Sequence, residues 1–300
     1  GELFGAPRPL VSAAVPVFFQ QLAAQPSPCL TELQRPLSGC DALLELPQDP
    51  WVPLGMYHAA VSRHPMVGGY TSRHYPYRFA GDAPGVAQLV APTAADLGPD
   101  IYTPSLRDLA LRTMDYYGLR YVVVHPLDEY RAADALQATL SALFGPTGQA
   151  DGSLTIYTVP RGPQDQAFLY LGAGWHALEQ DAAGTRWHWT EQAATVRVLV
   201  PPGTAGAYTL QLDVYSVSGP RTLVAHLDGQ EIGRSTVSPA PGGRMTLPVT
   251  LTPGQHTLTL ASVEPAITSP GDPRAISLGY HTLGLTRSGQ GADGRPQAQP

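Results

Sequence analysis

The pattern of the sequence changes at residues 160–163, Pro-Arg-Gly-Pro, and this change most limits what the chain can fold into. Before it, apolar runs alternate with segments of helical periodicity, whereas no helical pattern is found between residues 168 and 287. The later part holds short apolar segments separated by turn residues, which is typical of antiparallel strands. We therefore predict domains at 1–160 and 164–287, followed by a disordered tail at 288–300.

The first domain is predicted to be an α/β module. Strands are expected at 43–46, 119–125 and 153–159. Helices are expected at 15–24, at 54–63, from a cap at Thr103 or Ser105 to about 117, and at 128–144. The run LRYVVVH at 119–125 is continuous and β-branched, as in strands buried on both faces. The alternation of strand and helix predicts some parallel pairing. Residues 78–103 have no clear periodicity and are predicted to be loop.

The second domain is predicted to be an all-β sandwich with a jelly-roll arrangement. Its expected strands are 168–171, 186–189, 194–200, 207–215, 221–227, 230–237, 244–251, 255–263 and 276–286. Asp228-Gly229 lies between two of them and is a strong signal for a tight hairpin turn. Many short strands with turn signals between them are typical of sandwiches and jelly rolls.

Composition excludes several classes of function. The chain contains no Lys and no Asn, so it has no Schiff-base lysine, no Lys-containing phosphate loop and no N-glycosylation acceptor. The net charge is −6 and the arginines form no basic stripe, so nucleic acid is not an expected partner. No run reaches the roughly 18 apolar residues of a membrane helix. The start at Gly1, without Met, fits a piece of a larger protein.

The stretch from Leu43 to Tyr77 has the highest density of polar side chains that are able to bind a ligand or take part in catalysis. His58, His64, Arg73 and His74 are predicted to form a ligand-binding edge, with the arginine contacting anions or sugar hydroxyls. The alternative is a hydrogen-bonded loop that seals the edge of a sheet. The histidine spacing is not the i, i+4 spacing of helical metal pairs, and no metal site is predicted.

Glu45 lies in the first strand, where it alternates with apolar neighbours. It fits either a solvated strand face or an acid of a site, and the solvated face is the favoured interpretation.

Three of the four tryptophans, Trp175, Trp187 and Trp189, lie close together in the sequence. Trp187 and Trp189 share one face of a strand, and aromatic platforms of this kind suit sugar stacking. The alternative is that the rings fill the sandwich core. Residues 172–177, GAGWHA, match a dinucleotide fingerprint, but the helix that the fingerprint requires is missing from this all-β region. No cofactor is predicted.

The two cysteines, Cys29 and Cys40, are candidates for a disulfide. Closing a loop of that length stabilises a chain by about 3 kcal/mol. Such a bond indicates an oxidising compartment. A pair of unlinked thiols is the alternative.

Two groups of segments resemble a known family. The first is LLELPQDPWVPLGMYHAAVSRHPMVGGYTSR with LRYVVVH, and the second is LGAGWHALEQDAAGTRWHW with LDGQEIG, LTPGQHTLTL and SPGDPRAISLGY. Together they resemble the C-terminal extracytoplasmic region of bacterial multi-spanning membrane proteins similar to C-superfamily glycosyltransferases, which use polyprenyl-phosphate sugar donors. The resemblance covers roughly residues 40 to 287. The family's catalytic acids lie between membrane helices, so it implies no catalytic residue here.

The resemblance implies a location on the extracytoplasmic side of the cytoplasmic membrane, with the transmembrane part of the same polypeptide as partner. The expected function is non-catalytic: binding or positioning a glycan or lipid-linked acceptor. One alternative is a free-standing carbohydrate-active enzyme that uses the sandwich as its binding module. Another is a purely structural or assembly module.

Overall fold

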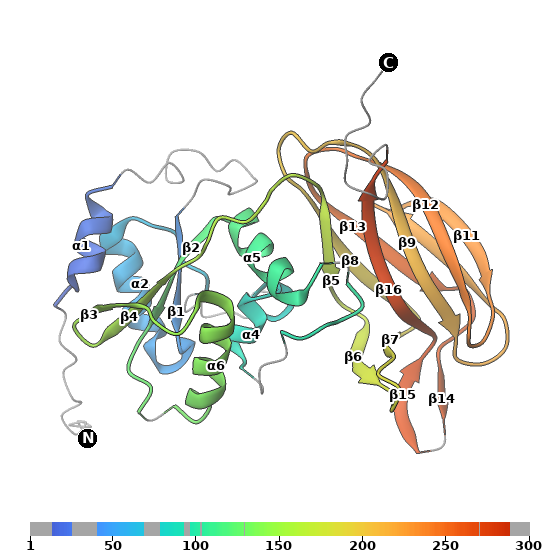
Figure 1. Cartoon of the computed structure of the whole chain (residues 1–300), viewed down its shortest axis with the longest axis horizontal. Helices are drawn as coiled ribbons and strands as arrows, with labels where there is room; N and C mark the ends of the chain where they lie inside the picture. The colour runs from blue at the N-terminus through green and yellow to red at the C-terminus, as the bar shows by residue number, and fades with distance from the viewer. Residues whose placement is uncertain are drawn as a thin grey trace, which may run out of the picture.

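The computed structural model describes residues 14–25, 41–68, 79–92, 97–102, 104–128, 130–269 and 271–288, without the side chains of 49–53 and 269. A small mixed sheet with helices packed around it forms one end, and two larger antiparallel sheets form the other (Figure 1). The predicted β-sandwich is confirmed. The predicted domain boundaries stay predictions, and residues 289–300 of the predicted tail lie outside the described part.

The small sheet is built around the apolar strand predicted at 119–125. This strand, β2 (Leu119–Val124), pairs in parallel with β1 (Ala42–Leu46) and antiparallel with β4 (Leu154–Thr158). A short strand, β3 (Gln149–Asp151), pairs with β4 at the sheet edge. The expected parallel pairing is therefore present between β1 and β2.

Helices cover both faces of this sheet (Figure 1). One face is covered by α1 (Val17–Ala23) and α2 (Gln48–Ser62), and the other by α4 (Val86–Val90), α5 (Leu106–Tyr116) and α6 (Ala133–Phe144). Successive strand residues face opposite ways, so both faces need apolar side chains. Burial on both sides explains the continuous apolar run of β2.

Some helix boundaries differ from the prediction. α2 begins at Gln48 rather than at 54, and Pro50 lies in its first turn, where the N–H groups have no partner in the helix and a proline is tolerated. It ends at Ser62, and the capping residue Arg63 adopts the left-handed conformation with φ 60°. α6 begins at Ala133 rather than at 128.

The prediction of loop throughout 78–103 is wrong. It contains α3 (Phe79–Asp82) and α4, two helices too short to show helical periodicity. In the described part of the chain, no helix is long and apolar enough to cross a bilayer.

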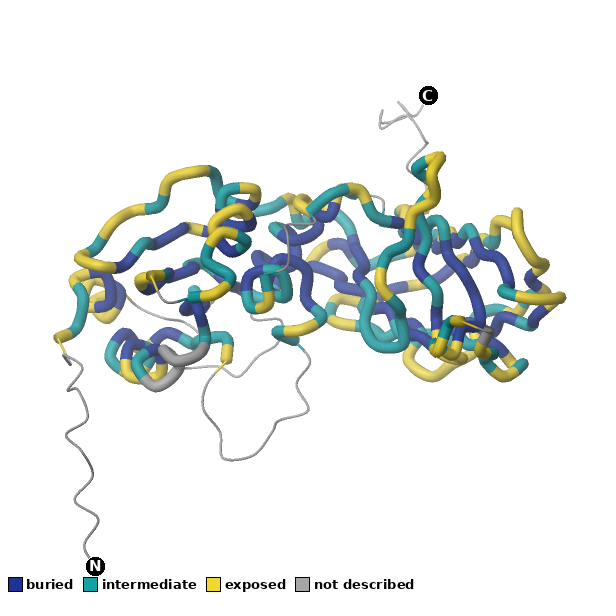
Figure 2. Tube along the Cα trace, turned by 90° about the horizontal axis from the view of Figure 1, so that it is seen from below, coloured by how far each residue is buried: buried dark blue, intermediate teal, exposed yellow. Residues whose placement is uncertain are grey.

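The sandwich consists of two five-stranded sheets, with strand orders β11-β10-β13-β8-β5 and β12-β9-β16-β7-β6. The first contains β5 (Phe168–Leu171), β8 (Ala193–Val200), β10 (Arg221–Leu227), β11 (Gln230–Val237) and β13 (Gly254–Ser262). The second contains β6 (Trp175–Gln180), β7 (Arg186–Thr190), β9 (Gly206–Ser216), β12 (Gly243–Leu251) and β16 (Leu278–Arg287). Figure 2 shows buried residues along the strands of both the sandwich and the small sheet.

The hairpin predicted at Asp228-Gly229 is confirmed. It joins β10 to β11, and both turn residues have positive φ, 50° for Asp228 and 84° for Gly229. Positive φ at both positions is what a two-residue turn matching the strand twist requires. β6 and a second hairpin, formed by β14 (Ile267–Ser269) and β15 (Asp272–Ile276), were not predicted, because their sequences lack clear apolar alternation.

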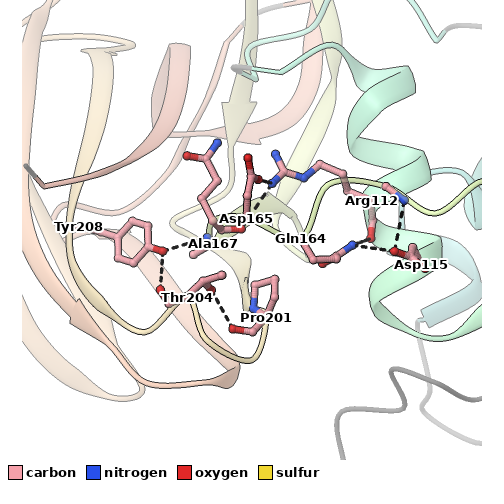
Figure 3. Close-up of polar contacts among 10 residues, drawn as sticks. Arg112, Asp115, Gln164, Asp165, Ala167, Pro201, Thr204 and Tyr208 are labelled. Carbon is pink, nitrogen blue, oxygen red and sulfur yellow. Dashed lines mark hydrogen bonds and ion pairs between the residues drawn. The ribbon is translucent and has the colours of Figure 1, made fainter. Parts of the chain in front are cut away.

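A connector at residues 160–167 joins the two parts and is held at its N-terminal side by α5 (Figure 3). The buried guanidinium of Arg112 donates a 2.8 Å hydrogen bond to Asp165 and lies 5.2 Å from the ring centroid of Phe168. The amide of Gln164 donates to the carbonyl of Arg112 and to the carboxylate of Asp115. These contacts fix the chain as it leaves the small sheet.

The same connector is held on its sandwich side by Tyr208. This buried hydroxyl accepts a 3.1 Å hydrogen bond from the N–H of Ala167 and donates a 2.6 Å bond to the carbonyl of Thr204 (Figure 3). The N-terminal part also supplies residues to the sandwich: Ile101 belongs to its core, and Asp100 accepts a 2.9 Å hydrogen bond from His188. The two parts are therefore joined by packing as well as by the connector.

Candidate functional site

Four aromatic side chains gather on the outer side of the second sandwich sheet. They are Trp187 and Trp189 of β7, Tyr215 of β9 and His281 of β16, here termed the aromatic face. Neighbours along these strands, such as Val214 and Tyr280, belong to the sandwich core. Because successive side chains of a strand point to opposite sides, the four aromatic residues point away from the core.

The rings of the aromatic face contact one another as a continuous group. Trp189 meets Tyr215 edge-on with centroids 5.0 Å apart, and Tyr215 stacks on His281 at 4.7 Å with an angle of 18° between the planes. Trp187 meets His281 edge-on at 6.3 Å. Such arrangements suit the aromatic quadrupole and hold the rings in fixed orientations.

Gly279 of β16 makes the close packing of these rings possible. It pairs with Trp189 on one side and with Tyr215 on the other. A Cβ atom at this position would lie 2.4 Å from the Tyr215 ring, so the tyrosine ring lies directly against bare backbone. Any larger residue would displace the ring.

Charged groups lie at the border of the aromatic face. Glu179 of β6 is the cross-strand partner of Trp187 and accepts a 2.6 Å hydrogen bond from Arg274 of β15. Burial, together with the charge of Glu179, raises the pKa of Tyr215, which keeps its hydroxyl protonated. Tyr215 is only 7% exposed and supports the group from beneath, so the accessible surface combines the half-buried indole rings of Trp187 and Trp189 with a carboxylate and a guanidinium.

Asp272 binds the same arginine and is expected to titrate far below its ordinary range. The hydrogen bonds and charge of Arg274 lower the pKa of Asp272 to about 2. A lowered folded-state pKa means that the stabilisation is present above about pH 4 and is lost as the pH falls through about 2. NMR titration of the Asp272 carboxyl is expected to show this value, and Arg274→Gln to return it towards about 4. An unchanged midpoint in the variant would contradict the ion pair.

A second polar cluster lies in the small sheet, buried between β1, α2 and the end of β2. Glu45 accepts hydrogen bonds through the same oxygen, Oε2, from His58 Nδ1 at 3.0 Å and from His125 Nε2 at 2.8 Å. Phe19 of α1 stacks on the His58 ring at 4.0 Å. The favoured interpretation of Glu45 as part of a solvated strand face is wrong, because helix α2 covers that face and leaves the residue 4% exposed.

The electrostatics of this cluster favour an ionised Glu45. Burial acts to raise its pKa, but the hydrogen bonds and charges of His125 and His58 outweigh burial and hold the pKa below its ordinary value. The other carboxylate oxygen, Oε1, is buried and has no hydrogen-bond partner among the described residues. A buried carboxylate oxygen without a partner costs free energy of folding. The described protein groups therefore do not fill the hydrogen-bonding capacity of this cluster.

The structure brings together some of the residues predicted to bind ligand and separates others. Trp187 and Trp189 lie together on the aromatic face, whereas Trp175 packs against the sandwich core and donates its indole N–H to the carbonyl of Thr195. His58 and His64 are 1% and 3% exposed rather than at an open edge, because α2 folds back onto the sheet. Ligand binding by any of these residues stays a prediction.

Four residues of interest lie outside the described part of the chain: Arg73, His74, Cys29 and Cys40. Sequence reasoning also missed functional candidates inside it. Tyr215, Gly279 and His281 join the tryptophans only through the pairing of β9, β16 and β7, which no local pattern reveals. His125 closes the predicted strand LRYVVVH, and its position at a strand end beside a carboxylate-bearing strand was the available signal.

No protein-family model matches the chain, and no curated protein matches it. Among solved structures, the chain is similar to the C-terminal CBM6 of LamC, a marine laminarinase from Zobellia galactanivorans, with 13% identity, 41% of this chain and 100% of that chain covered, and a TM-score of 0.28. It is also similar to a CBM35 from Paenibacillus barcinonensis, with 14% identity, coverage of 40% and 99%, and a TM-score of 0.28.

A third similar structure is the carbohydrate-binding module CBM6cm-2 of Cellvibrio mixtus lichenase 5A in complex with cellotriose, with 13% identity, coverage of 42% and 93%, and a TM-score of 0.27. TM-scores this low do not bear on what the chain does. The sandwich is established by its own strand order.

Proposed function

We propose that the sandwich binds carbohydrate at the aromatic face. The observation that carries this proposal is the fixed group of Trp187, Trp189 and Tyr215 on the outer side of one sheet, with Glu179 and Arg274 at its border. Sugar rings present C–H groups that pack on π-faces, and their hydroxyls pair with charged groups through strong hydrogen bonds. A surface with both features suits a polyhydroxylated ligand better than a purely apolar partner.

The proposed role is recognition without catalysis. The chain would hold a glycan, or the sugar portion of a lipid-linked acceptor, for a membrane-bound enzyme of the glycosyltransferase type. This setting, on the extracytoplasmic side of the membrane and joined to a transmembrane part, is supported by the sequence resemblance alone. In this arrangement the N-terminal part serves as an α/β module that carries the jelly-roll domain.

Binding is expected to depend on individual rings of the aromatic face. The chain would be screened against a glycan array, and the best oligosaccharide then measured by calorimetry with the wild type and with Trp189→Ala. Loss of a central aromatic anchor typically costs more than 1 kcal/mol, so the affinity is expected to fall about tenfold. Circular dichroism of each variant checks that the sandwich remains folded.

A matched control is Val263→Ser, which changes a residue that is 55% exposed and follows β13 in the other sheet. Its affinity is expected to equal that of the wild type. Wild-type protein that binds no glycan would contradict the proposal, as would Trp189→Ala binding as tightly as wild type. In either case the aromatic face would have a packing role that stabilises the outer side of the sheet.

A further inference from the structure

Three donor atoms converge in the buried cluster of the small sheet. Glu45 Oε2, His58 Nδ1 and His125 Nε2 all lie within 4.8 Å of one another, and each residue is at most 4% exposed. They come from three separate elements: β1, α2 and the residue that follows β2. Two imidazole nitrogens and one carboxylate are a donor set that Zn²⁺ accepts readily in proteins.

We propose that Glu45, His58 and His125 bind a Zn²⁺ ion. Glu45 Oε1 is buried and has no hydrogen-bond partner among the described residues, so it is available as a fourth donor atom. Chelation by both carboxylate oxygens and by the two imidazole nitrogens supplies four donor atoms and leaves no fourth position for water. The ion removes the cost of an orphaned carboxylate oxygen in the interior.

The geometry is close to what the ion requires. Zinc bonds of about 2.0–2.1 Å at tetrahedral angles place ligand atoms of different residues about 3.3 Å apart. The two imidazole nitrogens lie 3.0 Å and 2.8 Å from Glu45 Oε2, so a small outward movement of the rings makes room. The two rings are already nearly parallel, with 4° between their planes and centroids 6.1 Å apart.

The surroundings limit movement of the carboxylate and keep the site dry. Gly55 of α2 faces Glu45, and a Cβ atom there would lie 3.3 Å from the carboxylate carbon, closer than most such contacts. Phe19 covers the His58 ring on its outer side. Such a closed site, with low exposure of every ligand, is typical of zinc that stabilises a fold rather than zinc that activates water. The site is separate from the aromatic face and does not depend on carbohydrate binding.

The test uses the whole chain after dialysis against a chelator. Titration with Zn²⁺, and with Co²⁺ as a visible reporter, is expected to show one ion per chain, visible absorption of four-coordinate cobalt without thiolate bands, and a higher melting temperature. Changes to residues that only support a ligand already cost 10–100-fold in affinity, so His58→Gln and His125→Gln are each expected to weaken binding at least about 100-fold.

His64→Gln is the matched control. His64 is also buried, and its ring bonds the carbonyl of Ser62 rather than the cluster, so this variant is expected to bind zinc like the wild type. Absence of stoichiometric uptake by the wild type would overturn the proposal, as would unchanged affinity in His58→Gln and His125→Gln. If these variants do not fold, X-ray absorption on the wild-type cobalt complex decides: two imidazoles support the site, and sulfur or no imidazole overturns it.

Discussion

Gly174→Ala is expected to destabilise the chain by about 2–5 kcal/mol, combining about 1–2 kcal/mol for a left-handed backbone and about 1–3 kcal/mol for overpacking. Gly174 has φ +86°, and a Cβ atom there would lie 2.2 Å from the carbonyl oxygen of Ala193 and 2.9 Å from the Cα of Ala194. Both are backbone atoms of β8, which pairs with a strand on each side in its sheet. A rigid strand cannot yield as a flexible side chain would, so the clash displaces the segment.

Chemical denaturation monitored by circular dichroism measures this loss. Gly203→Ala provides the control, because Gly203 has a similar φ of +82° but open space around the position of a Cβ atom. That variant is expected to lose only the stability that the left-handed backbone costs a non-glycine residue, about 1–2 kcal/mol. Equal losses of unfolding free energy in the two variants would show that the close approach of Gly174 to β8 adds nothing to the destabilisation.

The same glycine explains a sequence match that carries no chemistry. Gly172 and Gly174 are the glycines of the dinucleotide-like segment GAGWHA, and in the structure they lie where the chain passes close to β8. A Cβ atom on Gly172 would meet the Thr195 hydroxyl at 2.6 Å. Glycine marks close backbone approach of any kind, and only the flanking elements say whether the approaching partner is a phosphate or a neighbouring strand.

Much of the fold was predictable because its signals are local. The Asp228-Gly229 turn and the cap at Ser105, whose hydroxyl accepts the N–H of Asp108, each depend on neighbouring residues alone. The strands of the sandwich follow from apolar segments punctuated by turn residues. The short α3 and α4 were missed because one turn of helix has no period to detect.

The candidate sites were only partly predictable because they depend on long-range pairing. Trp187 and Trp189 are neighbours in sequence, but Tyr215 joins them only because β16 places Gly279 between β7 and β9. The spacing of His58 and His64 gave no indication of metal binding, since the cluster uses His58 with Glu45 and His125, which come from other elements. Rules based on residue spacing detect only metal sites whose ligands come from one helix or loop.

Tyr208→Phe is expected to destabilise the chain by about 1–3 kcal/mol, the usual cost of leaving buried partners unsatisfied. The change removes one hydroxyl and leaves two groups without this hydrogen-bond partner, the N–H of Ala167 and the carbonyl of Thr204. Ala167 ends the connector between the two parts, and Thr204 precedes β9 (Figure 3). The loss therefore acts where the connector is fastened to the sandwich.

Tyr280→Phe separates this effect from loss of a hydroxyl as such. Tyr280 is as fully buried as Tyr208, at 0% exposed, but its hydroxyl has no hydrogen-bond partner among the described residues, and burial raises its pKa. Removing this hydroxyl abolishes its desolvation cost and takes a hydrogen bond from no other described group. The free energy of unfolding is therefore expected to stay unchanged or to rise. Urea unfolding of both variants gives the comparison. A loss in Tyr280→Phe equal to that in Tyr208→Phe would mean that the cost reflects packing of the hydroxyl, and not its two hydrogen bonds to the connector and β9.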